Sequence, residues 1–382
     1  MKCGELFEKI EELYPFYIKV WEDVCNIESP TNYKAGVDEV CKYIIEMAQK
    51  RGWQVEISKQ DVAGDAACIT INPDAEKAAV CISGHIDTVH PIGIFGKKAA
   101  YVDGEKIYGP GVMDCKGGVV AGLLAMDALS QIGFTSRPVK LIIQSDEETG
   151  SKTSGKKTVE FMCEKAKGAI AFLNTEGSET GDVTLIRKGI LRCRFNITGK
   201  AVHSSVCYDG ANAVCETAHK IIELEKMKDK DGITCNCGVI EGGTVANTVA
   251  EHCSFLADIR YATQEQKNLA IKAVKHISEN ITVKGCSCEL EILSERPPME
   301  KADRNLRLLE KMNEIYTQCG LETVEHIARN GGSDAAYITK AKIPCVDNIG
   351  VIGGGIHSAR EFAMLRSLDL SAKRMAAVVY CI

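Results

Sequence analysis

The pattern of apolar and polar positions divides the chain into stretches with different periodicities. In the first part, short apolar runs alternate with amphipathic runs of helical period. The predicted strands are 77–85, 138–148 and 169–177, and the predicted helices are 117–133 and 156–168. Gly133 is expected to end the first of these helices. Such alternation is typical of a largely parallel sheet that is covered by helices.

The pattern changes near Lys188, where the residues begin to alternate with period two. The predicted elements that follow are a strand at 189–200, a helix at 211–227, strands at 235–243 and 251–262, a helix at 263–281 and a strand at 288–295. This βαββαβ order is that of a ferredoxin-like sandwich of about 110 residues.

The α/β pattern returns after Arg296–Glu300, a segment whose two prolines stop both strand and helix. A strand is predicted at 343–350 and a helix at 358–381. We therefore predict the α/β fold class, with a mainly parallel sheet covered by helices in a discontinuous domain of residues 1–187 and 297–382. A compact α+β domain, residues 188–296, is expected to be inserted into it.

Composition narrows the class of protein. The 382 residues are 45% hydrophobic and 26% charged, with a net charge of −6. This mild acidity predicts neither nucleic acid nor an anionic membrane as a partner. No apolar run approaches the ~20 residues that span a bilayer. The first 24 residues mix charges into an amphipathic helical pattern instead of the apolar core of a secretory signal, so we expect a cytoplasmic protein.

Eighteen cysteines are many for such a chain, and several lie within apolar strand or helix patterns. Without a secretory signal, free thiols are the preferred interpretation. Two Cys-x-Cys pairs, Cys235 with Cys237 and Cys286 with Cys288, each place both thiols on one face of a strand. This spacing fits a structural zinc site made from both pairs, and it fits alternation into a hydrophobic core better.

Polar residues gather where the predicted strands of the first domain end. The set comprises His85 and Asp87, the triplet Asp146–Glu148, Glu176, His357, and Asp114 just before a helix. In open α/β sheets the carboxyl ends of the strands form the ligand crevice. His85, Asp114, Glu148, Glu176 and His357 supply two imidazoles and three carboxylates, a suitable shell for two zinc-like ions with one bridging carboxylate. Without cations these carboxylates would repel one another.

Five segments together resemble the signatures of the co-catalytic dizinc metallopeptidases. They are "SGHIDTVHP", "GPGVMDCKGG", "SDEETGS", "GGSDAAY" and "GGGIHSARE". This family includes glutamate carboxypeptidase, peptidase T, succinyl-diaminopimelate desuccinylase and acetylornithine deacetylase. The resemblance covers nearly the whole chain. It implies a zinc-exopeptidase-like fold in which the inserted domain is a lid, and a homodimer formed through that domain.

The resemblance also implies roles for the polar residues. Asp114 would bridge two metal ions, His85 and Glu176 would complete one shell, and Glu148 and His357 the other. Glu147 would be the general base, and Asp87 would accept the second N–H of the His85 ring. Asp146 is expected to be a solvated turn residue.

The peptide bond between Asp114 and Cys115 would be cis by the same resemblance. The family often has Asp or Asn after the bridging residue, so Cys115 is a departure that puts the polar contact of that neighbour in doubt.

Four further residues are expected to bind substrate. "GKAVHSS" resembles the element whose histidine, here His203, holds the developing oxyanion, and the alternative is a surface histidine. Asn247 and Arg260 lie in a stretch that also resembles the family. The Arg260 guanidinium suits a substrate carboxylate, or else forms an ordinary salt bridge. Gly354 would bring its backbone N–H to the substrate, or only make a tight turn.

The function that these resemblances imply is hydrolysis of an amide bond next to a free carboxylate, by a carboxypeptidase or dipeptidase of glutamate-carboxypeptidase type. The nucleophile would be a water between two divalent metal ions, zinc in first place and cobalt or manganese as alternatives. The substrate would be a small peptide or an N-acyl amino acid. An N-acyl amino acid deacylase, an aminotripeptidase and a non-catalytic metal-dependent binding protein remain alternatives.

Overall fold

The computed structural model describes residues 3–230 and 232–382, and the chain divides into two compact units. The first unit comprises the chain up to Leu185 together with Lys301–Ala328 and Ser333–Ile382, and the second comprises Ile186–Glu300 and Arg329–Gly332. Each unit is described by itself.

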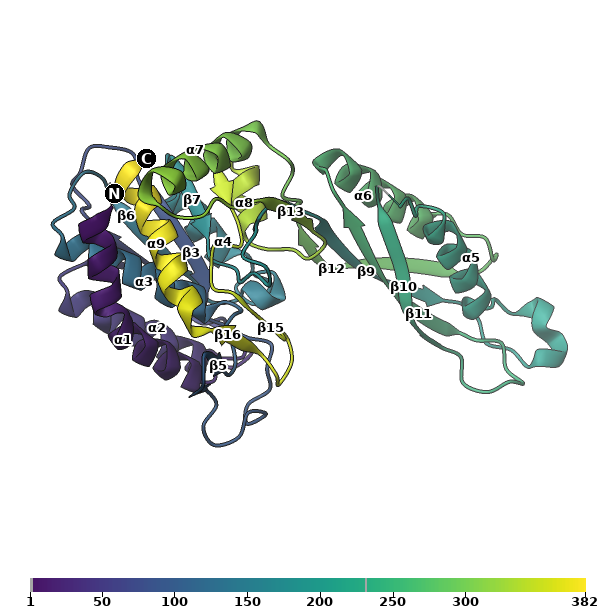
Figure 1. Cartoon of the computed structure of the whole chain (residues 1–382). Helices are drawn as coiled ribbons and strands as arrows, with labels where there is room; N and C mark the ends of the chain where they lie inside the picture. The colour runs from purple at the N-terminus through teal and green to yellow at the C-terminus, as the bar shows by residue number, and fades with distance from the viewer. Residues whose placement is uncertain (1–2, 231) are drawn as a thin grey trace. The chain divides into compact units, whose positions relative to one another are not determined.

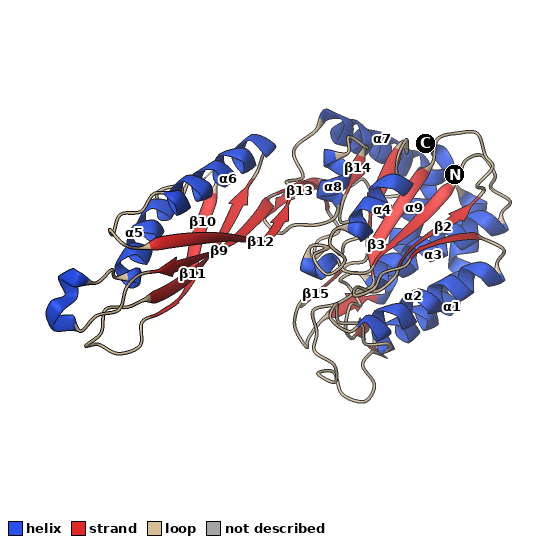
Figure 2. Cartoon of the chain, turned by 180° about the vertical axis from the view of Figure 1, so that it is seen from behind, coloured by secondary structure: helices blue, strands red, loops and turns tan. Residues whose placement is uncertain are grey.

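The first unit is an α/β assembly (Figures 1 and 2). Its helices are α1 (Gly4–Asn26), α2 (Lys34–Lys50), α3 (Lys116–Gln131), α4 (Lys157–Lys165), α7 (Asp303–Cys319), α8 (Ala335–Lys340) and α9 (Leu365–Cys381). Its main strands are β1 (Gln54–Ser58), β2 (Ala66–Ile71), β3 (Val80–His85), β6 (Val139–Gln144), β7 (Ala171–Asn174) and β14 (Cys345–Val346). Shorter strands are β4 (Tyr101–Asp103), β5 (Lys106–Tyr108), β15 (Gly353–Gly354) and β16 (Phe362–Met364), while β8 (Val183–Arg187) pairs with β13 (His326–Arg329).

The central sheet has the strand order β1-β2-β6-β3-β7-β14. Strands β6, β3, β7 and β14 run parallel, and β1 and β2 add an antiparallel edge. All residues of β2, β3 and β7 are buried, as expected for strands covered on both faces. The predicted fold class is therefore confirmed, with an antiparallel edge that the sequence pattern did not indicate.

Helices cover both faces of this sheet. A Cβ on Gly122 of α3 would lie against Ile82 and Leu141. The neighbouring strand residue Ser83 contacts Met162 of α4 instead. Since successive strand side chains point to opposite faces, α3 and α4 lie on opposite sides of the sheet. Helices α1 and α9 pack on α3 and complete one covering layer, in which purple α1 and yellow α9 lie side by side in Figure 1.

Two predicted elements near the C-terminus have different bounds in the structure. The helix predicted from 358 begins at Leu365, because Phe362–Met364 pairs with β5 as strand β16. The strand predicted at 343–350 is only Cys345–Val346 long, because Asp347 and Ile349 bond to Thr184 and Asn174 instead of continuing the ladder. Gly133 has φ = 74° just after α3, as the predicted helix end requires.

The second unit has the predicted βαββαβ order. Its elements are β9 (Gly189–Thr198), α5 (Ala213–Glu225), β10 (Thr234–Gly242), β11 (His252–Tyr261), α6 (Gln264–Glu279) and β12 (Ser287–Arg296). The antiparallel strand order β10-β11-β9-β12 is that of a ferredoxin-like sheet. Side-chain caps begin both helices: Asn212 accepts from the backbone of Val214 and Cys215, and Thr263 accepts from that of Gln266.

The two Cys-x-Cys pairs do not form a joint metal site. Cys235 and Cys237 lie on β10, and Cys288 lies on β12, the opposite edge of the four-stranded sheet. Three strand spacings of about 4.8 Å separate these edges by roughly 14 Å. Cys235 is part of the hydrophobic core of this unit, and the other three cysteines pack against it. Alternation into the core was therefore the correct interpretation.

No helix in the described part of the chain combines the length and apolar character that a membrane crossing needs.

Candidate metal centre

The predicted metal ligands lie at one edge of the central sheet. His85 ends β3, Glu148 lies in a short 3₁₀ turn after β6, and Glu176 follows β7 by two residues. Strands β6, β3 and β7 are parallel neighbours, so their carboxyl ends meet at the same edge. Asp114 precedes α3, and His357 lies in the turn between β15 and β16 with φ = 57°.

The two carboxylate oxygens of Asp114 face two different imidazoles. Oδ1 lies 3.1 Å from Nε2 of His85, and Oδ2 lies 3.2 Å from Nε2 of His357. The same imidazole nitrogens lie 3.8 Å from Oε1 of Glu176 and 3.4 Å from Oε2 of Glu148, respectively. The five residues thus form two ligand triads that share Asp114.

These separations fit two metal shells. Two ligand atoms that each lie about 2.1 Å from one ion at the tetrahedral angle are about 3.4 Å apart. The four measured distances, 3.1 to 3.8 Å, lie around that value. Imidazole nitrogen and carboxylate oxygen are also the donors that zinc, cobalt and manganese accept. His85, Asp114 and Glu176 would hold one ion, and Asp114, Glu148 and His357 the other.

The pKa values of the ligand side chains also indicate a cation site. Burial raises the pKa of Glu148 to about 8 and holds the pKa of Glu176 well above its ordinary value, and the charge of Asp114 adds to both effects. Hydrogen bonds with Asp114 and Glu148 raise the pKa of His357 to about 10. Burial acts to raise the pKa of Asp114, but its hydrogen bonds with His357 and His85 outweigh burial and lower it. Without cations, protons must therefore offset the buried negative charge.

Metal binding is expected to release protons, and metal affinity to fall as pH falls from about 8 to about 6. Near pH 7 the metal-free Glu148 and His357 hold protons because their pKa values are raised to about 8 and about 10, and an ion must displace these protons. Each displaced proton changes the apparent affinity about tenfold per pH unit, or about 1.4 kcal/mol. Calorimetric zinc titration in two buffers of different ionisation enthalpy counts the protons. An affinity that stays constant over this range would contradict the assignment.

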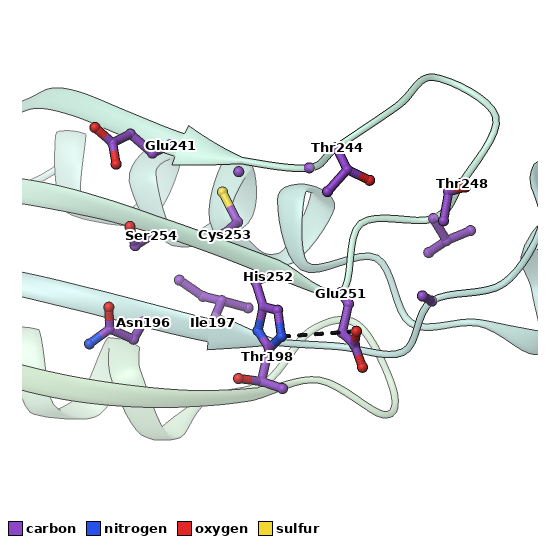
Figure 3. A pocket seen from close by; sticks show the side chains of 14 residues that line it. Asn196, Ile197, Thr198, Glu241, Thr244, Thr248, Glu251, His252, Cys253 and Ser254 are labelled. Atoms are coloured by element: carbon purple, nitrogen blue, oxygen red, sulfur yellow. Dashed lines mark ion pairs between the residues drawn. The ribbon is translucent and has the colours of Figure 1, made fainter.

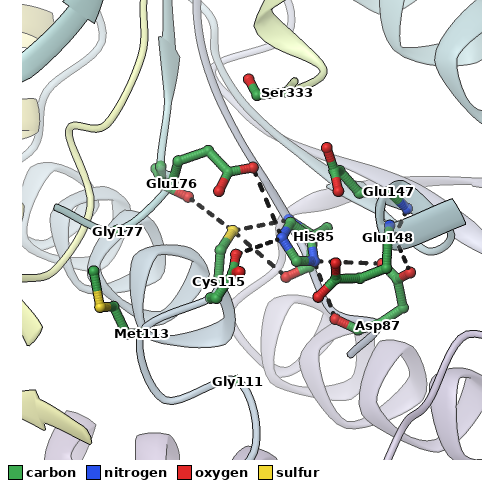
Figure 4. A network of polar contacts seen from close by, with 12 residues as sticks. His85, Asp87, Gly111, Met113, Cys115, Glu147, Glu148, Glu176, Gly177 and Ser333 are labelled. Carbon is green, nitrogen blue, oxygen red and sulfur yellow. Dashed lines mark hydrogen bonds and ion pairs between the residues drawn. The ribbon is translucent and has the colours of Figure 1, made fainter. Parts of the chain in front are cut away.

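Asp87 connects the ligand-bearing loops (Figure 4). Nδ1 of His85 donates to the main-chain oxygen of Asp87 at 3.0 Å, and the Asp87 carboxylate lies 3.4 Å from the same nitrogen. That carboxylate accepts from the backbone N–H groups of Glu147 at 3.1 Å and Glu148 at 3.2 Å, and from the Thr31 hydroxyl at 2.7 Å. The main-chain carbonyl of Asp87 fixes the tautomer of His85, so that Nε2 is directed at Asp114. The Asp87 carboxylate holds the turn of Asp146–Glu148 next to His85.

Asp146 is not the solvated turn residue that the sequence suggested. It is fully buried, and its carboxylate accepts from the Thr158 hydroxyl at 2.6 Å and from the backbone N–H of Ser154 at 2.8 Å. Burial raises the pKa of Asp146. Helix α4 and the turn before it supply these donors, so Asp146 fixes the turn that carries Glu147 and Glu148. The prediction failed because the donors come from a segment that had not been assigned to the site.

Glu147 is buried beside the ligands, and its side chain is drawn with them in Figure 4. Burial is the main cause of the raised pKa values of Glu148 and Glu176, and the charge of Glu147 contributes to both. The Glu147 carboxylate affects the pKa of one ligand in each triad but belongs to neither triad. A group that transfers protons needs such a position.

The Asp114–Cys115 peptide bond is cis, as the resemblance implied. The departure at Cys115 leaves a polar contact in place, since its Sγ accepts from the backbone N–H of His85 at 3.1 Å. A Cβ on Gly84 would come within 2.3 Å of Thr175 Oγ1 and 3.0 Å of Cys115 Sγ. Only glycine therefore lets the strand that carries His85 approach these side chains.

Glu361 is a functional residue that the sequence analysis missed. Its buried carboxylate accepts from the backbone N–H groups of Gly111 at 3.1 Å, Met113 at 2.9 Å and Asp114 at 3.0 Å. It also lies 2.9 Å from Nε2 of His90. Three of these contacts fix the loop that carries the shared ligand, and the fourth is to His90. The available signal was its position four residues after His357 within "GGGIHSARE".

Glu361→Gln is expected to weaken metal binding about 10- to 100-fold, the usual effect of losing a group that orients a ligand. The amide keeps one acceptor oxygen but cannot serve all three backbone N–H groups and His90. Competition with a chelator gives the affinity. Because the ligands themselves remain, excess metal should restore most of the activity. Unchanged affinity, or activity that excess metal does not restore, would contradict this positioning role. Glu310→Gln, on the exposed face of α7, is the control.

The second unit brings two predicted substrate residues side by side. The backbone N–H of Ser204 donates to the Asn247 carbonyl at 2.9 Å, and His203 pairs with Thr248 in a β-bridge. His203 is exposed, and its Nδ1 accepts from the backbone N–H of Ser205 at 3.2 Å. A neutral ring in that arrangement carries its proton on Nε2, the type of donor that an oxyanion requires. An open groove of ≈ 480 Å³ in this unit includes Thr248 and Ala201 (Figure 3).

Arg260 is already paired within the second unit. Its Nε and terminal nitrogen donate to the two carboxylate oxygens of Asp258 at 2.5 and 3.0 Å, and Arg192 contacts the same carboxylate. Arg260 therefore forms the ordinary salt bridge that was the alternative to substrate binding. A substrate carboxylate would have to compete with Asp258 for the guanidinium.

The glycines near His357 have steric roles of their own. A Cβ on Gly353 would lie 2.1 Å from the Phe362 carbonyl oxygen, and Gly355 has φ = 72° with the Arg360 carbonyl 2.6 Å from its ideal Cβ position. A Cβ on Gly354 would lie 3.2 Å from the Phe362 ring. A tight turn therefore accounts for Gly353 and Gly355, while a backbone contact from Gly354 to substrate stays a prediction.

Comparison with known proteins identifies the family. Residues 81–380 match the model of "Peptidase family M20/M25/M40". Carboxypeptidase G2 of Pseudomonas sp. (strain RS-16) is 28% identical over 374 residues, which cover 96% of this chain and 88% of that protein. Aminopeptidase PepT from Bacillus cereus has the same fold, with TM-score 0.77, 21% identity and coverage of 96% and 98% of the two chains. So does YXEP of Bacillus subtilis, described as a dinuclear metal binding peptidase, with TM-score 0.70, 16% identity and coverage of 97% and 98%. The chain belongs to peptidase family M20/M25/M40 and is a metal-dependent hydrolase of that family.

Proposed function

We propose that this protein is a carboxypeptidase or dipeptidase that uses two metal ions to hydrolyse an amide bond next to a free carboxylate. The observation that carries the proposal is the Asp114 carboxylate shared between two ligand triads, with Glu147 beside both. The similarity to carboxypeptidase G2, which extends over 96% of the chain, supports a carboxypeptidase.

The chain's own residues divide the work. When bound, two divalent cations, zinc in first place, supply Lewis acidity and make a water molecule easier to deprotonate. The Glu147 carboxylate takes the proton from the attacking water and returns it to the leaving nitrogen. Asp87 and Glu361 hold the loops of His85 and Asp114, so the ligands need little rearrangement during turnover.

We assign the recognition of substrate to the residues that the resemblance indicated. His203 would donate from Nε2 to the developing oxyanion, Asn247 lies beside it, and Arg260 would bind the terminal carboxylate. Gly354 would offer its backbone N–H. The lid role of the inserted unit, a homodimer formed through it and a cytoplasmic location are part of the same proposal and rest on the resemblance.

Matched substrates distinguish the alternatives. The purified protein is loaded in turn with zinc, cobalt and manganese. It is then incubated with four compounds related to one dipeptide that ends in glutamate. These are the free dipeptide, its N-acetyl form, its C-terminal amide and the corresponding N-acetyl amino acid. Mass spectrometry identifies the products. A carboxypeptidase cleaves the N-acetyl dipeptide between its residues and not the amide.

The other outcomes are equally informative. Cleavage that requires a free N-terminus and tolerates the amide indicates an aminopeptidase, and removal of the acetyl group alone indicates a deacylase. Either result would replace the proposed specificity while leaving the metallohydrolase in place. The absence of turnover in a protein that holds two metal ions per chain, with this set and with a wider set of tripeptides and acyl groups, would favour a binding protein.

A further inference from the structure

Three cysteines meet where three helices of the first unit end or begin, outside the centre described above. Cys3 is the N-cap of α1, Cys319 is the last residue of α7, and Cys381 is the last residue of α9. The sulfur of Cys3 lies 2.7 Å from that of Cys319 and 3.7 Å from that of Cys381, and the other two sulfurs are 3.9 Å apart. Cys3 and Cys319 are buried, and Cys381 is half-buried.

Two of these separations match a thiolate metal site. Zinc binds thiolate sulfur at about 2.3 Å, so two sulfurs in a tetrahedral shell lie about 3.8 Å apart. The distances of 3.7 and 3.9 Å from Cys381 agree with that value. The third distance, 2.7 Å, lies between a zinc-bound pair and a disulfide bond of about 2.05 Å. It must widen by about 1 Å to admit an ion.

The surroundings favour an ion over a disulfide. A disulfide would use two sulfurs and leave the third beside it, whereas one cation uses all three. The cluster lies among apolar side chains, including Ile315, Ala377 and Phe7. Three thiolates would be costly there without a bound cation. The N-terminus of α1 favours negative charge at Cys3, and the C-termini of α7 and α9 favour positive charge at the centre of the cluster.

We propose that Cys3, Cys319 and Cys381 bind one thiophilic divalent cation, zinc, in a three-thiolate site that is separate from the catalytic centre. Binding releases the three thiol protons, and the half-buried side of Cys381 leaves a fourth position for water. The ion would tie together α1, α7 and α9, helices that already pack as α1 on α9 and α7 on α9. Its role is structural, because no residue of the catalytic centre belongs to the cluster.

The test begins with the unmodified full-length protein, purified under reducing conditions. Zinc content is measured by elemental analysis, and thiol alkylation is mapped by peptide mass spectrometry with and without zinc. We expect three zinc ions per chain and protection of these three cysteines by zinc. Cobalt in place of zinc should give a thiolate charge-transfer absorption that the His and carboxylate ligands cannot produce. Two zinc ions per chain with no protection, or a mass lower by two hydrogens with Cys3 linked to Cys319, would overturn the proposal.

Variants separate this site from the catalytic one. Cys381→Ser should lose the cobalt–thiolate absorption and one zinc ion while keeping most of the hydrolytic activity at low temperature, with a lower melting temperature. Cys163→Ser, at a half-buried thiol of α4, is the matched control and should keep all three ions. Asp114→Asn should lose the other two ions and keep the absorption. If Cys381→Ser retains the absorption, the assignment is wrong, and the alkylation map of the unmodified protein decides the question if that variant does not fold.

Discussion

Glu147→Gln is expected to lower kcat by about 10²- to 10⁴-fold, the range that general acid–base catalysis contributes. Glutamine keeps the size of the side chain but cannot take a proton from the attacking water. The ligand triads do not include Glu147, so the metal content should stay at the wild-type level. The two measurements are single-turnover hydrolysis of the best substrate and elemental analysis of the same sample.

Glu164→Gln is the control, since the Glu164 side chain is 73% exposed on α4. Wild-type kinetics are expected for it. If Glu147→Gln kept more than about a tenth of the activity with full metal occupancy, the proton would have to move through another group. If the variant lost its metal, Glu147 would be a metal ligand. The assignment of proton transfer to Glu147 and of metal binding to Glu148 would then be wrong.

Asp114→Asn is expected to impair both metal sites at once and to lower activity by at least about 10³-fold. Each oxygen of Asp114 faces a different imidazole, so the substitution weakens both triads. It leaves a neutral amide in place of the carboxylate that contacts both imidazoles. Losing several kcal/mol of charge stabilisation in the transition state corresponds to a rate loss of this size.

Substitution of Glu148 gives a useful contrast, because this residue belongs to only one triad. Glu148→Gln should lose one of the two ions of the catalytic centre and retain the other, whereas Asp114→Asn should lose both. Asp103→Asn, at an exposed position on β4, serves as the control. Full occupancy by two ions in Asp114→Asn would show that Asp114 is not the shared ligand.

The sequence pattern predicted several long elements well and the short ones poorly, and it did not predict the long helices α2 and α7. Helix α3 and strands β3, β6 and β7 were expected because each has a clear apolar period and a defined stop. Strand β16 was missed because three residues cannot show a period, and its conformation comes from pairing with β5, more than 250 residues away in the sequence. Local propensity had indicated helix there, and the tertiary pairing overrode it.

The ligands could be predicted from the sequence, whereas the residues that hold the ligand loops could not. His85, Asp114, Glu148, Glu176 and His357 carry recognisable chemistry at strand ends, and the structure brings all five together. Glu361 and Asp146 hold the ligand loops through buried carboxylates. A buried carboxylate that accepts backbone N–H groups and an exposed surface carboxylate have the same letter in a sequence, so only the folded contacts distinguish them.

The hairpin of β15 and β16 supplies both His357 of the second triad and, just before β16, the Glu361 carboxylate that holds the loop of the first. Both arrive roughly 180 residues after Glu176, which at about 5–20 residues per second is about 10–40 s of translation. During that interval a nascent chain contains most of the ligands but cannot retain the ions tightly. Metal occupancy therefore indicates that synthesis has passed this hairpin and that the hairpin has docked. A chain that stalls, is cut or misfolds before that point remains without its metals and without hydrolytic activity.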